Sequence, residues 1–269
     1  MELYYDFHMH SCLSPCGDNE MTPFNLVNTA KIFGFDIIAL TDHNSCRNCR
    51  AAMEAGKAAG LTVVPGMELC TSEEIHVVCL FPTIDNAERF SDFVHDNIPP
   101  VKNRVEIFGD QLVMDSTDNV VGTEEILLNT ASYFSIDEVP DLVKDYGGAC
   151  FPAHIDRHSY SILSALGDFS DTLDVRAFEL TMQADEDYYR KTYPATRDKI
   201  LLRDSDAHYL ENILLPEHTI DLPENTPQAL IDFLKGCIPC LTPIPHSNFS
   251  WRATTARRWS LPRLHPCSA

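Results

Sequence analysis

The sequence predicts an α/β fold in which parallel strands form a closed or nearly closed barrel, and three observations lead to this prediction. Short apolar runs alternate with helical patterns along most of the 269 residues, an order typical of parallel βαβ units. About seven strands can be recognised, which favours a barrel over a small open sheet. Histidine and acidic residues recur in or just after these strands, and the strand ends of such a barrel are where active sites are built.

The composition is that of a folded and strongly acidic protein, with 44% hydrophobic residues and a formal net charge of −20. Such a charge argues against broad, nonspecific binding to a phosphate backbone, and we expect no extended nucleic-acid surface. Bound divalent cations would neutralise part of it. No apolar run reaches the length of about 18 residues that a membrane span needs. Glu2 and Asp6 stand where a signal peptide would be basic.

The first half of the chain supplies four of the expected strands. Thr22 and Pro23 have the residue types of an N-cap and a first helical position, and Gly34 has that of a helix end. The apolar run at 35–41 can be buried on both faces of the sheet. The elements expected here are strands at 3–10, 35–41, 61–71 and 75–81, and helices at 22–34, 48–59 and 85–95.

An insertion interrupts the alternation at about 96–135, where two prolines and the turn signal Asp118-Asn119 predict a loop and a hairpin. From its position we expect it to roof the pocket and set specificity. The other expected elements are helices at 123–134, 135–146 and 226–235, and strands at 149–153, 175–181 and 199–203. Residues 1–244 would form one domain. Residues 245–269 are basic and lack apolar periodicity, so we expect a disordered tail.

Polar residues at the strand ends predict a metal site. Asp6, His8 and His10 project from one face of the first strand, although alone they would also suit the surface of a half-buried strand. Six strands together deliver such groups: His8, His10, Asp42, His43, Glu68, His76, His154, Asp206 and His208. Mixed imidazole and carboxylate ligands suit zinc, manganese or iron. So many ligands indicate two or three divalent ions, which can clamp a phosphoryl group.

These motifs resemble the PHP (polymerase and histidinol phosphatase) domain family over about residues 3–236. They are Asp6-Phe-His-Met-His10, Thr41-Asp-His-Asn44, Gly66-Met-Glu68, Ala153-His154 and Asp204-Ser-Asp-Ala-His208. The resemblance implies a distorted (β/α)7 TIM-like barrel with a trinuclear metal site at the C-terminal ends of the strands. It also implies a stand-alone phosphoesterase that uses a metal-bridging hydroxide.

The resemblance implies a role for each matching position. The first ion would be held by His8, His10, Glu68 and Asp206, the second by Glu68, His76 and His154, and the third by His43, His208 and a residue after His10. For that last ligand we favour Asp18 and keep Cys16 as the alternative, because family members commonly use aspartate or histidine there. Asp6 and Asp42 match positions that orient ligands.

Catalytic roles beyond the ligands are assigned to Glu68 as the bridge, to Arg157 and to His158. Arg157 would stabilise the phosphoryl oxygens and His158 would protonate the leaving group, although both residues also suit a solvated loop. The expected substrate is a small phosphomonoester or a nucleotide, with oligonucleotide ends as a further option within the family. The acidic surface has no basic stripe with interleaved aromatics, which supports the smaller substrates.

Three alternatives stay open. The first is a non-catalytic PHP module, which would have the same strands but would not hydrolyse a substrate. An amidohydrolase-type enzyme would open with the same His-x-His, but its dinuclear members typically use a carboxylated lysine on a strand as the bridge, and this sequence has no lysine at the C-terminal end of a predicted strand. The pairs Cys46/Cys49 and Cys237/Cys240 could form a four-thiolate metal site, line the mouth of the active site, or be unlinked thiols. Ten cysteines in so large a chain predict reduced thiols and a cytoplasmic location.

Overall fold

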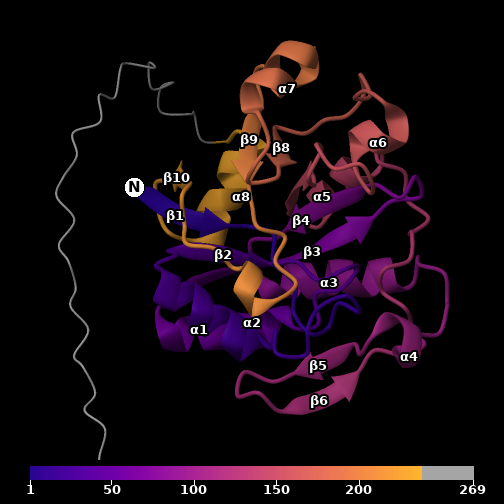
Figure 1. The fold of residues 1–269 in the computed structure, drawn as a ribbon, viewed down its shortest axis with the longest axis vertical. Coiled ribbons are helices and arrows are strands. Elements are labelled where there is room, and N and C mark those ends of the chain that lie inside the picture. Colours follow the sequence, from indigo (N-terminus) through magenta and orange to yellow (C-terminus); the bar gives the residue numbers. More distant parts are fainter. Residues whose placement is uncertain (238–269) are drawn as a thin grey trace, which may run out of the picture. The chain divides into compact units, whose positions relative to one another are not determined.

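The structure, a computed structural model, describes residues 1–237, and a curled sheet lies at its centre (Figure 1). The strands of this sheet are β1 (Glu2–Asp6), β2 (Ile37–Leu40), β3 (Thr62–Cys70), β4 (His76–Leu80), β7 (Ala149–Pro152) and β10 (Thr219–Asp221). They are hydrogen-bonded in the order β10-β1-β2-β3-β4-β7. β1, β2 and β3 run parallel to one another, whereas β4 runs antiparallel to both β3 and β7.

Two further strands nearly close the sheet into a barrel. β8 (Ala177–Leu180) and β9 (Ile200–Arg203) pair in parallel. On one side, Ile155 N beyond β7 donates to Glu179 O of β8 at 2.9 Å; on the other, His10 N beyond β1 donates to Ala207 O beyond β9 at 2.9 Å. The predicted α/β barrel-like fold is confirmed. Seven regular βα units are not established, because β3 leads into the antiparallel β4 through a short turn without a helix.

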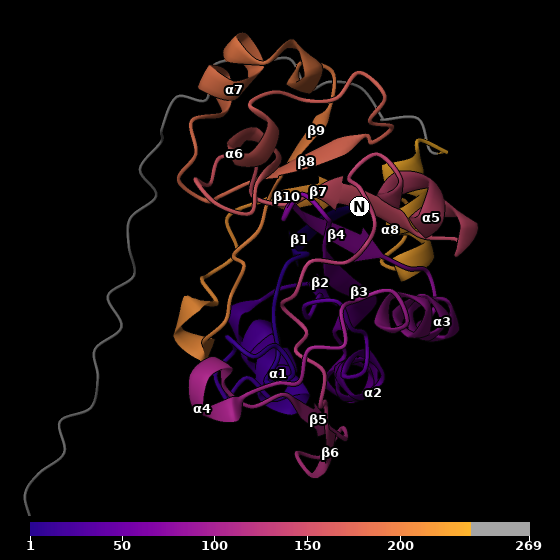
Figure 2. The same cartoon turned by 90° about the vertical axis from the view of Figure 1, so that its right-hand side faces the viewer.

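Helices cover the outside of the curled sheet (Figure 2). The helices of residues 1–237 are α1 (Pro23–Phe33), α2 (Cys49–Ala59), α3 (Ile84–His95), α4 (Val105–Phe108), α5 (Val139–Asp145), α6 (Ile162–Leu166), α7 (Glu186–Thr192) and α8 (Pro227–Lys235). Two 3-10 turns are also present, η1 (Pro194–Thr196) and η2 (Leu210–Asn212). The capping residues expected for α1 are confirmed, since Thr22 Oγ1 accepts from Asn25 N at 3.1 Å and Gly34 has a φ of 97°. Within residues 1–237, no helix is long and apolar enough to cross a membrane.

Two hydrophobic clusters stabilise the fold. The first fills the inside of the barrel, where Phe7 and Phe151 are fully buried and meet Leu230 of α8. Burial of each such side chain contributes about 1.5–3 kcal/mol. Leu222 N, just before α8, donates to Met1 O at the start of β1 at 3.0 Å. α8 therefore covers the end of the barrel where the strands begin, and the opposite end is left for polar residues.

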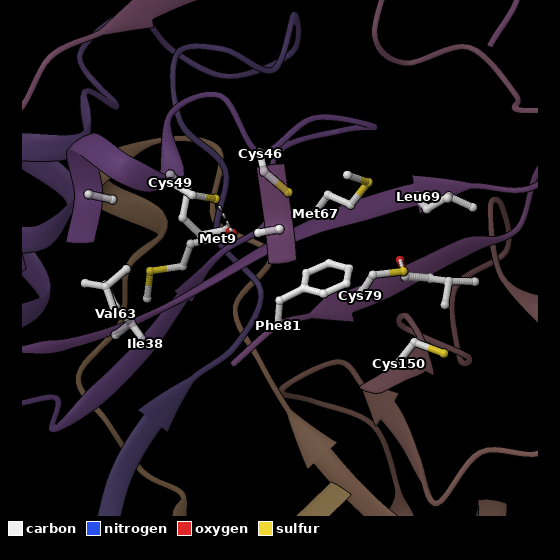
Figure 3. Close-up of a cluster of buried hydrophobic side chains, with 14 of the residues drawn as sticks. Met9, Ile38, Cys46, Cys49, Val63, Met67, Leu69, Cys79, Phe81 and Cys150 are labelled. Atoms are coloured by element: carbon white, nitrogen blue, oxygen red, sulfur yellow. Dashed lines mark hydrogen bonds between the residues drawn. The ribbon is translucent and has the colours of Figure 1, made fainter. Parts of the chain in front are cut away.

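The second cluster lies between the sheet and the helices (Figure 3). It contains Met67 of β3 and Phe81 beyond β4 together with Cys46 and Cys49, and all four are 0% exposed. Both cysteine thiols donate to Gly66 O, at 3.2 Å and 3.3 Å. Cys46 and Cys49 are thus hydrogen-bonded core residues. Cys237 is exposed, and Cys240 lies outside the described residues, as does the predicted tail at 245–269.

The prediction of a helix at 123–134 is wrong. This segment starts with the end of a hairpin, β5 (Leu112–Met114) and β6 (Val120–Thr123), and continues without a helix. The buried side chain of Gln111 explains why: its Nε2 donates to Glu124 O and Ile126 O at 2.9 Å and 2.8 Å, and its Oε1 accepts from Leu128 N at 2.9 Å. These backbone groups are therefore satisfied by a side chain distant from them in sequence instead of by helical hydrogen bonds.

Candidate metal centre

Glu68 lies near the end of β3 in the middle of a buried cluster of imidazoles, and it is 1% exposed. Its two carboxylate oxygens lie 2.8–3.4 Å from ring nitrogens of His8, His10, His43, His76 and His154. His76 reaches this cluster from the first residue of the antiparallel β4, which is paired with Cys70 at the end of β3. The site is therefore built at the C-terminal ends of the parallel strands and at the start of β4.

A second carboxylate, Asp206, lies beside the two histidines that follow β1. Asp206 Oδ1 lies 3.1 Å from His10 Nε2 and 3.3 Å from His8 Nε2, and the two Nε2 atoms are 3.1 Å apart. Two ligand atoms that each lie about 2.0 Å from one zinc ion at a tetrahedral angle are about 3.3 Å apart. The spacing among His8, His10, Glu68 and Asp206 therefore fits four ligands around one ion.

Two other groups have ligand atoms within 4.8 Å of one another: His43, Glu68 and His76, and His10, His43 and His208. The rings of His10 and His208 are stacked with their centroids 4.1 Å apart. His154 completes the set through its Nε2, which lies 3.2 Å from Glu68 Oε1. All eight expected ligands other than the residue after His10 thus converge on one site.

Unpartnered atoms show that the site suits cations. Glu68 Oε2, Asp206 Oδ1 and His43 Nδ1 are buried without a well-formed hydrogen bond among the described residues. A buried polar group in this state costs about 1–3 kcal/mol. Coordination of a divalent ion would satisfy such lone pairs. The donor set of imidazole nitrogens and carboxylate oxygens is one that zinc, manganese and iron accept.

Two of the expected ligands, Glu68 and His10, have the protonation state that a metal ligand needs, whereas neighbouring carboxylates raise the pKa of His8 and His43 against the opposing effect of burial. Burial opposes ionisation of Glu68, but the imidazoles of His76, His8 and His43 outweigh it and hold the pKa of Glu68 well below its usual range. Burial, reinforced by His208 and His43, lowers the pKa of His10, which keeps that ring neutral. A metal ligand must be an ionised carboxylate or a neutral imidazole, and these two residues meet that condition.

Asp42 organises the loop after His10 through two serines. Ser11 donates to Asp42 from its backbone N and from its Oγ, each at 2.7 Å, and Ser14 Oγ donates at 2.7 Å. The same Ser14 Oγ lies 2.9 Å from His10 Nδ1 and accepts from His43 N at 3.2 Å. Asp42 therefore orients His10 indirectly, which agrees with its predicted role and adds Ser14 to it.

Asp6 contacts the backbone of the ligand segments instead of a ligand side chain. Its Oδ1 accepts from His8 N at 3.2 Å and from Ser205 N at 3.3 Å. Burial raises the pKa of Asp6 to about 7. Asp6 thus joins the segment after β1 to the segment after β9, and so positions His8 beside Asp206.

Glu179 of β8 is a site residue that the sequence reasoning missed. It is 1% exposed, and its Oε2 accepts from His8 Nδ1 at 2.8 Å. Metal-bound histidines usually donate their other ring N–H to such a carboxylate, which fixes the ring and its tautomer. The signal in the sequence was an acidic residue in the middle of the apolar strand 175–181.

Two of the expected ligands have unusual backbone conformations. His154 and Asp206 have φ values of 27° and 50°, in the left-handed region that residues other than glycine rarely adopt. Such conformations cost about 1–3 kcal/mol each and collect at functional sites, where the surrounding structure enforces them. Both residues follow the end of a strand, and the turn directs their side chains toward Glu68.

A cavity of about 130 Å³ opens beside the ligands and is lined by Arg157, Ser159 and Tyr160 as well as the histidines. Arg157 forms an ion pair with Asp206, Nη1 to Oδ2, at 2.5 Å and is 43% exposed on its side chain. His158 is exposed and does not line this cavity. Tyr160 stacks on His76 with the ring centroids 4.7 Å apart. Arg157 is therefore a cationic side chain at the wall of this cavity.

The two candidates for the last ligand differ in position. Cys16 Sγ lies 3.2 Å from His43 Nε2. Desolvation opposes ionisation of this thiol, but hydrogen bonds from His208 and His43 outweigh it and lower the pKa of Cys16 to about 6. The carboxylate of Asp18 instead accepts a hydrogen bond from Glu20 N at 2.8 Å. Of the two, the structure brings Cys16 to the histidines.

The insertion does not roof the site, contrary to our expectation. None of the residues 96–135 lines the 130 Å³ cavity or its larger neighbour. The insertion instead supports the ligand-bearing loops: Leu112 N donates to Cys12 O at 2.9 Å, and Asn44 Nδ2 donates to Leu128 O at 2.6 Å. It also touches the loop after His10 at Gly109, where an added Cβ would lie 2.4 Å from Pro15 O.

Sequence comparison finds relatives that share part of this chain. The family model of the PHP domain matches residues 6–158, which is more than half of the 269 residues. A 5′-3′ exoribonuclease of Haemophilus influenzae is 35% identical over 79 residues, covering 28% of this chain and 28% of that protein. An uncharacterized protein of Methanocaldococcus jannaschii is 33% identical over 76 residues, covering 25% and 44%. The chain therefore matches less than half the length of either relative.

Solved structures extend the likeness to most of the fold. The lesion-specific endonuclease Q from Pyrococcus furiosus matches with a TM-score of 0.64 at 18% identity, over 89% of this chain and 57% of the endonuclease. Endonuclease Q in complex with a 27-mer duplex that bears an abasic lesion matches with a TM-score of 0.67 at 16% identity, over 89% and 58%. At these identities the shared property is the fold.

Proposed function

Because this chain belongs to the PHP domain family, we propose that it is a metal-dependent hydrolase of phosphoester bonds. The observation that supports this most strongly is Glu68, a buried carboxylate within 3.4 Å of five imidazoles. Two or three divalent ions of zinc, manganese or iron suit this ligand set.

Each ion has a proposed set of ligands. His8, His10, Glu68 and Asp206 hold the first, Glu68, His76 and His154 the second, and His43 and His208 the third. When bound, such ions lower the pKa of water and polarise phosphoryl oxygens. Glu179 fixes the ring of His8 through the 2.8 Å hydrogen bond, so that His8 Nε2 faces the centre of the site.

Arg157 binds the phosphoryl oxygens in this proposal. Its guanidinium lines the cavity beside the ligands and pairs with Asp206, so it lies where a phosphate would meet the metal ligands. Guanidinium groups suit phosphate because their N–H donors match its oxygens in pairs. Protonation of the leaving group by His158 stays a prediction, since that side chain is exposed in the same loop.

A small phosphomonoester or a nucleotide is the proposed substrate. The 130 Å³ cavity adjoins a second cavity of about 490 Å³, and Arg157 and Asp206 line both. The second cavity is lined by Glu179, Asp204 and Glu211 in addition, an acidic surface that would repel a second phosphate. The eight cysteines in residues 1–237 are free thiols, which supports a reducing compartment such as the cytoplasm.

A second candidate function is hydrolysis at the ends of nucleic acids. It is favoured by the fold shared with endonuclease Q in its duplex complex and by the sequence shared with the exoribonuclease. The duplex complex is at odds with the expectation of no extended nucleic-acid surface, at least for that homologue. In this candidate the same metal site would act on a terminal nucleotide.

The test is metal analysis of the purified chain combined with a hydrolysis screen in the presence of zinc, manganese or iron(II). Nucleoside monophosphates, simple phosphomonoesters and short oligonucleotides would be compared. We expect at least two ions per chain and release of phosphate or nucleotides that a chelator abolishes. Fewer ions and no hydrolysis of any phosphoester would refute the proposal. Bound ions without hydrolysis would identify a non-catalytic PHP module.

A further inference from the structure

The loop after His10 is held in a tight turn by hydrogen bonds and by a close backbone contact. Ser14 N donates to Ser11 O at 3.1 Å, and Gly17 N donates to Ser14 O at 2.8 Å. A Cβ on Gly17 would lie 2.5 Å from Ser11 O, so this turn requires glycine. The serines are themselves anchored on the buried carboxylate of Asp42. The position of the residue between Pro15 and Gly17 is therefore determined by the surrounding structure.

That residue is Cys16, and its sulfur points at two of the expected ligands of the third ion. Sγ lies 3.2 Å from His43 Nε2, and the ring of His208 is near enough to act on the thiol as well. The loop is tied to the same segment by its backbone, because Asp18 N donates to His208 O at 2.9 Å. A sulfur about 2.3 Å and a nitrogen about 2.0 Å from one zinc ion, at a tetrahedral angle, are about 3.5 Å apart. The observed spacing is close to this value.

Asp18 has a different structural role. Its carboxylate accepts from Glu20 N at 2.8 Å, and its carbonyl oxygen accepts from Met21 N at 3.0 Å. These hydrogen bonds shape the turn that leads into α1. Among the described residues, the Asp18 carboxylate makes no hydrogen bond to an imidazole, whereas Cys16 Sγ already lies 3.2 Å from His43 Nε2.

We infer that Cys16, and not Asp18, is the remaining ligand of the third ion, which is then held by a thiolate together with His43 and His208. The inference rests on the metal site of the proposed function and concerns the chemistry of one ligand. It departs from the aspartate or histidine that the family commonly has at this place. A thiolate is a soft ligand, so this ion site favours zinc, iron(II) or cobalt(II) over manganese or magnesium.

Cobalt(II) provides a test that does not depend on activity, because a thiolate bound to cobalt gives a charge-transfer band in the near ultraviolet. The full chain would be freed of metal, loaded with cobalt(II) and compared with its variants. All proteins would carry Cys237→Ser, Cys240→Ser and Cys267→Ser, so that neither the second Cys-x-x-Cys pair nor the last cysteine of the sequence can contribute a thiolate. We expect the band in this background, its loss in Cys16→Ser and in Cys16→Asp, and its retention in Asp18→Asn.

Cys16 is exposed, so its substitution should leave the fold unchanged, and circular dichroism of each metal-free variant checks this. Cys16→Asp supplies a harder ligand and is expected to bind manganese more tightly than the parent does. A band that persists in Cys16→Ser, or one that is absent from the cobalt-loaded parent, would overturn the inference. Failure to hydrolyse any phosphoester would count against the proposed function alone, because the band reports ligation in either case.

Discussion

The hydrogen bond between Glu179 and His8 allows a prediction whose size follows from the structure. Glu179→Ala removes the carboxylate that holds His8 Nδ1 at 2.8 Å, in a place where both side chains are at most 1% exposed. Hydrogen bonds to charged groups contribute about 1.5–3 kcal/mol. At about 1.4 kcal/mol per tenfold change, loss of this one predicts about 10- to 100-fold weaker metal binding, the range usual for such supporting residues.

The assay is a titration of the metal-free chain with zinc in competition with a chelator of known affinity. Glu179→Gln should lie near the lower end of the range, because its amide oxygen can still accept from His8 Nδ1. Glu211→Gln is the matched control, since Glu211 lines the neighbouring cavity but is exposed and contacts no ligand. If Glu179→Ala bound zinc as tightly as the wild type and the control do, Glu179 would not support the site as described.

Three further predictions follow from the same structure. Removal of the metals should lower the thermal unfolding temperature, because an ion at 100 times its dissociation constant stabilises the fold by about 2.7 kcal/mol; calorimetry with and without chelator measures this, and equal temperatures would contradict it. Arg157→Ala should reduce kcat/KM for a phosphomonoester by about 10- to 100-fold, because charge-assisted hydrogen bonds to the phosphoryl oxygens are lost. Arg157→Lys should recover part of the activity. Unchanged kinetics in Arg157→Ala would show that Arg157 does not bind the substrate. Gly109→Ala should destabilise the chain by about 1–3 kcal/mol and by more than Gly34→Ala. Gly109 has φ 96° and ψ 177°, a region that essentially only glycine adopts, and its Cβ would lie 2.4 Å from Pro15 O, whereas Gly34 is in the left-handed helical region with no atom within 4 Å of an added Cβ. Urea unfolding compares the two, and equal losses would mean that the contact with Pro15 is unimportant.

Most ligands could be predicted because they lie at strand ends in the sequence. His8, Glu68 and Asp206 follow apolar runs, and parallel strands bring such positions to one end of a barrel. His76 also lies at this end of the barrel, but for a different reason: β4 is antiparallel to β3 and contributes its first residue instead of its last. Strand direction depends on pairing between distant segments, which local pattern does not show.

Other features depended on contacts that the sequence does not display. Residues 123–134 have a helical pattern, yet the side chain of Gln111 binds their backbone and keeps them irregular. Glu179 is a site residue because the fold brings β8 beside His8, and this contact joins segments that are far apart in the sequence. For Cys16 and Asp18, counting residues left both open, and the 3.2 Å contact between Cys16 Sγ and His43 Nε2 is what separates them.

The central claim is that Glu68 bridges catalytic metal ions, and one measurement tests it most directly. Wild type and Glu68→Gln, both supplied with the ion that the metal analysis identifies, would be compared for the rate of phosphate release from the phosphomonoester that the hydrolysis screen selects. The amide keeps the shape of the side chain but removes the charge that lies within 3.4 Å of five imidazoles. We predict that phosphate release falls to the rate seen with chelator present. Release by the variant at the wild-type rate would contradict the account.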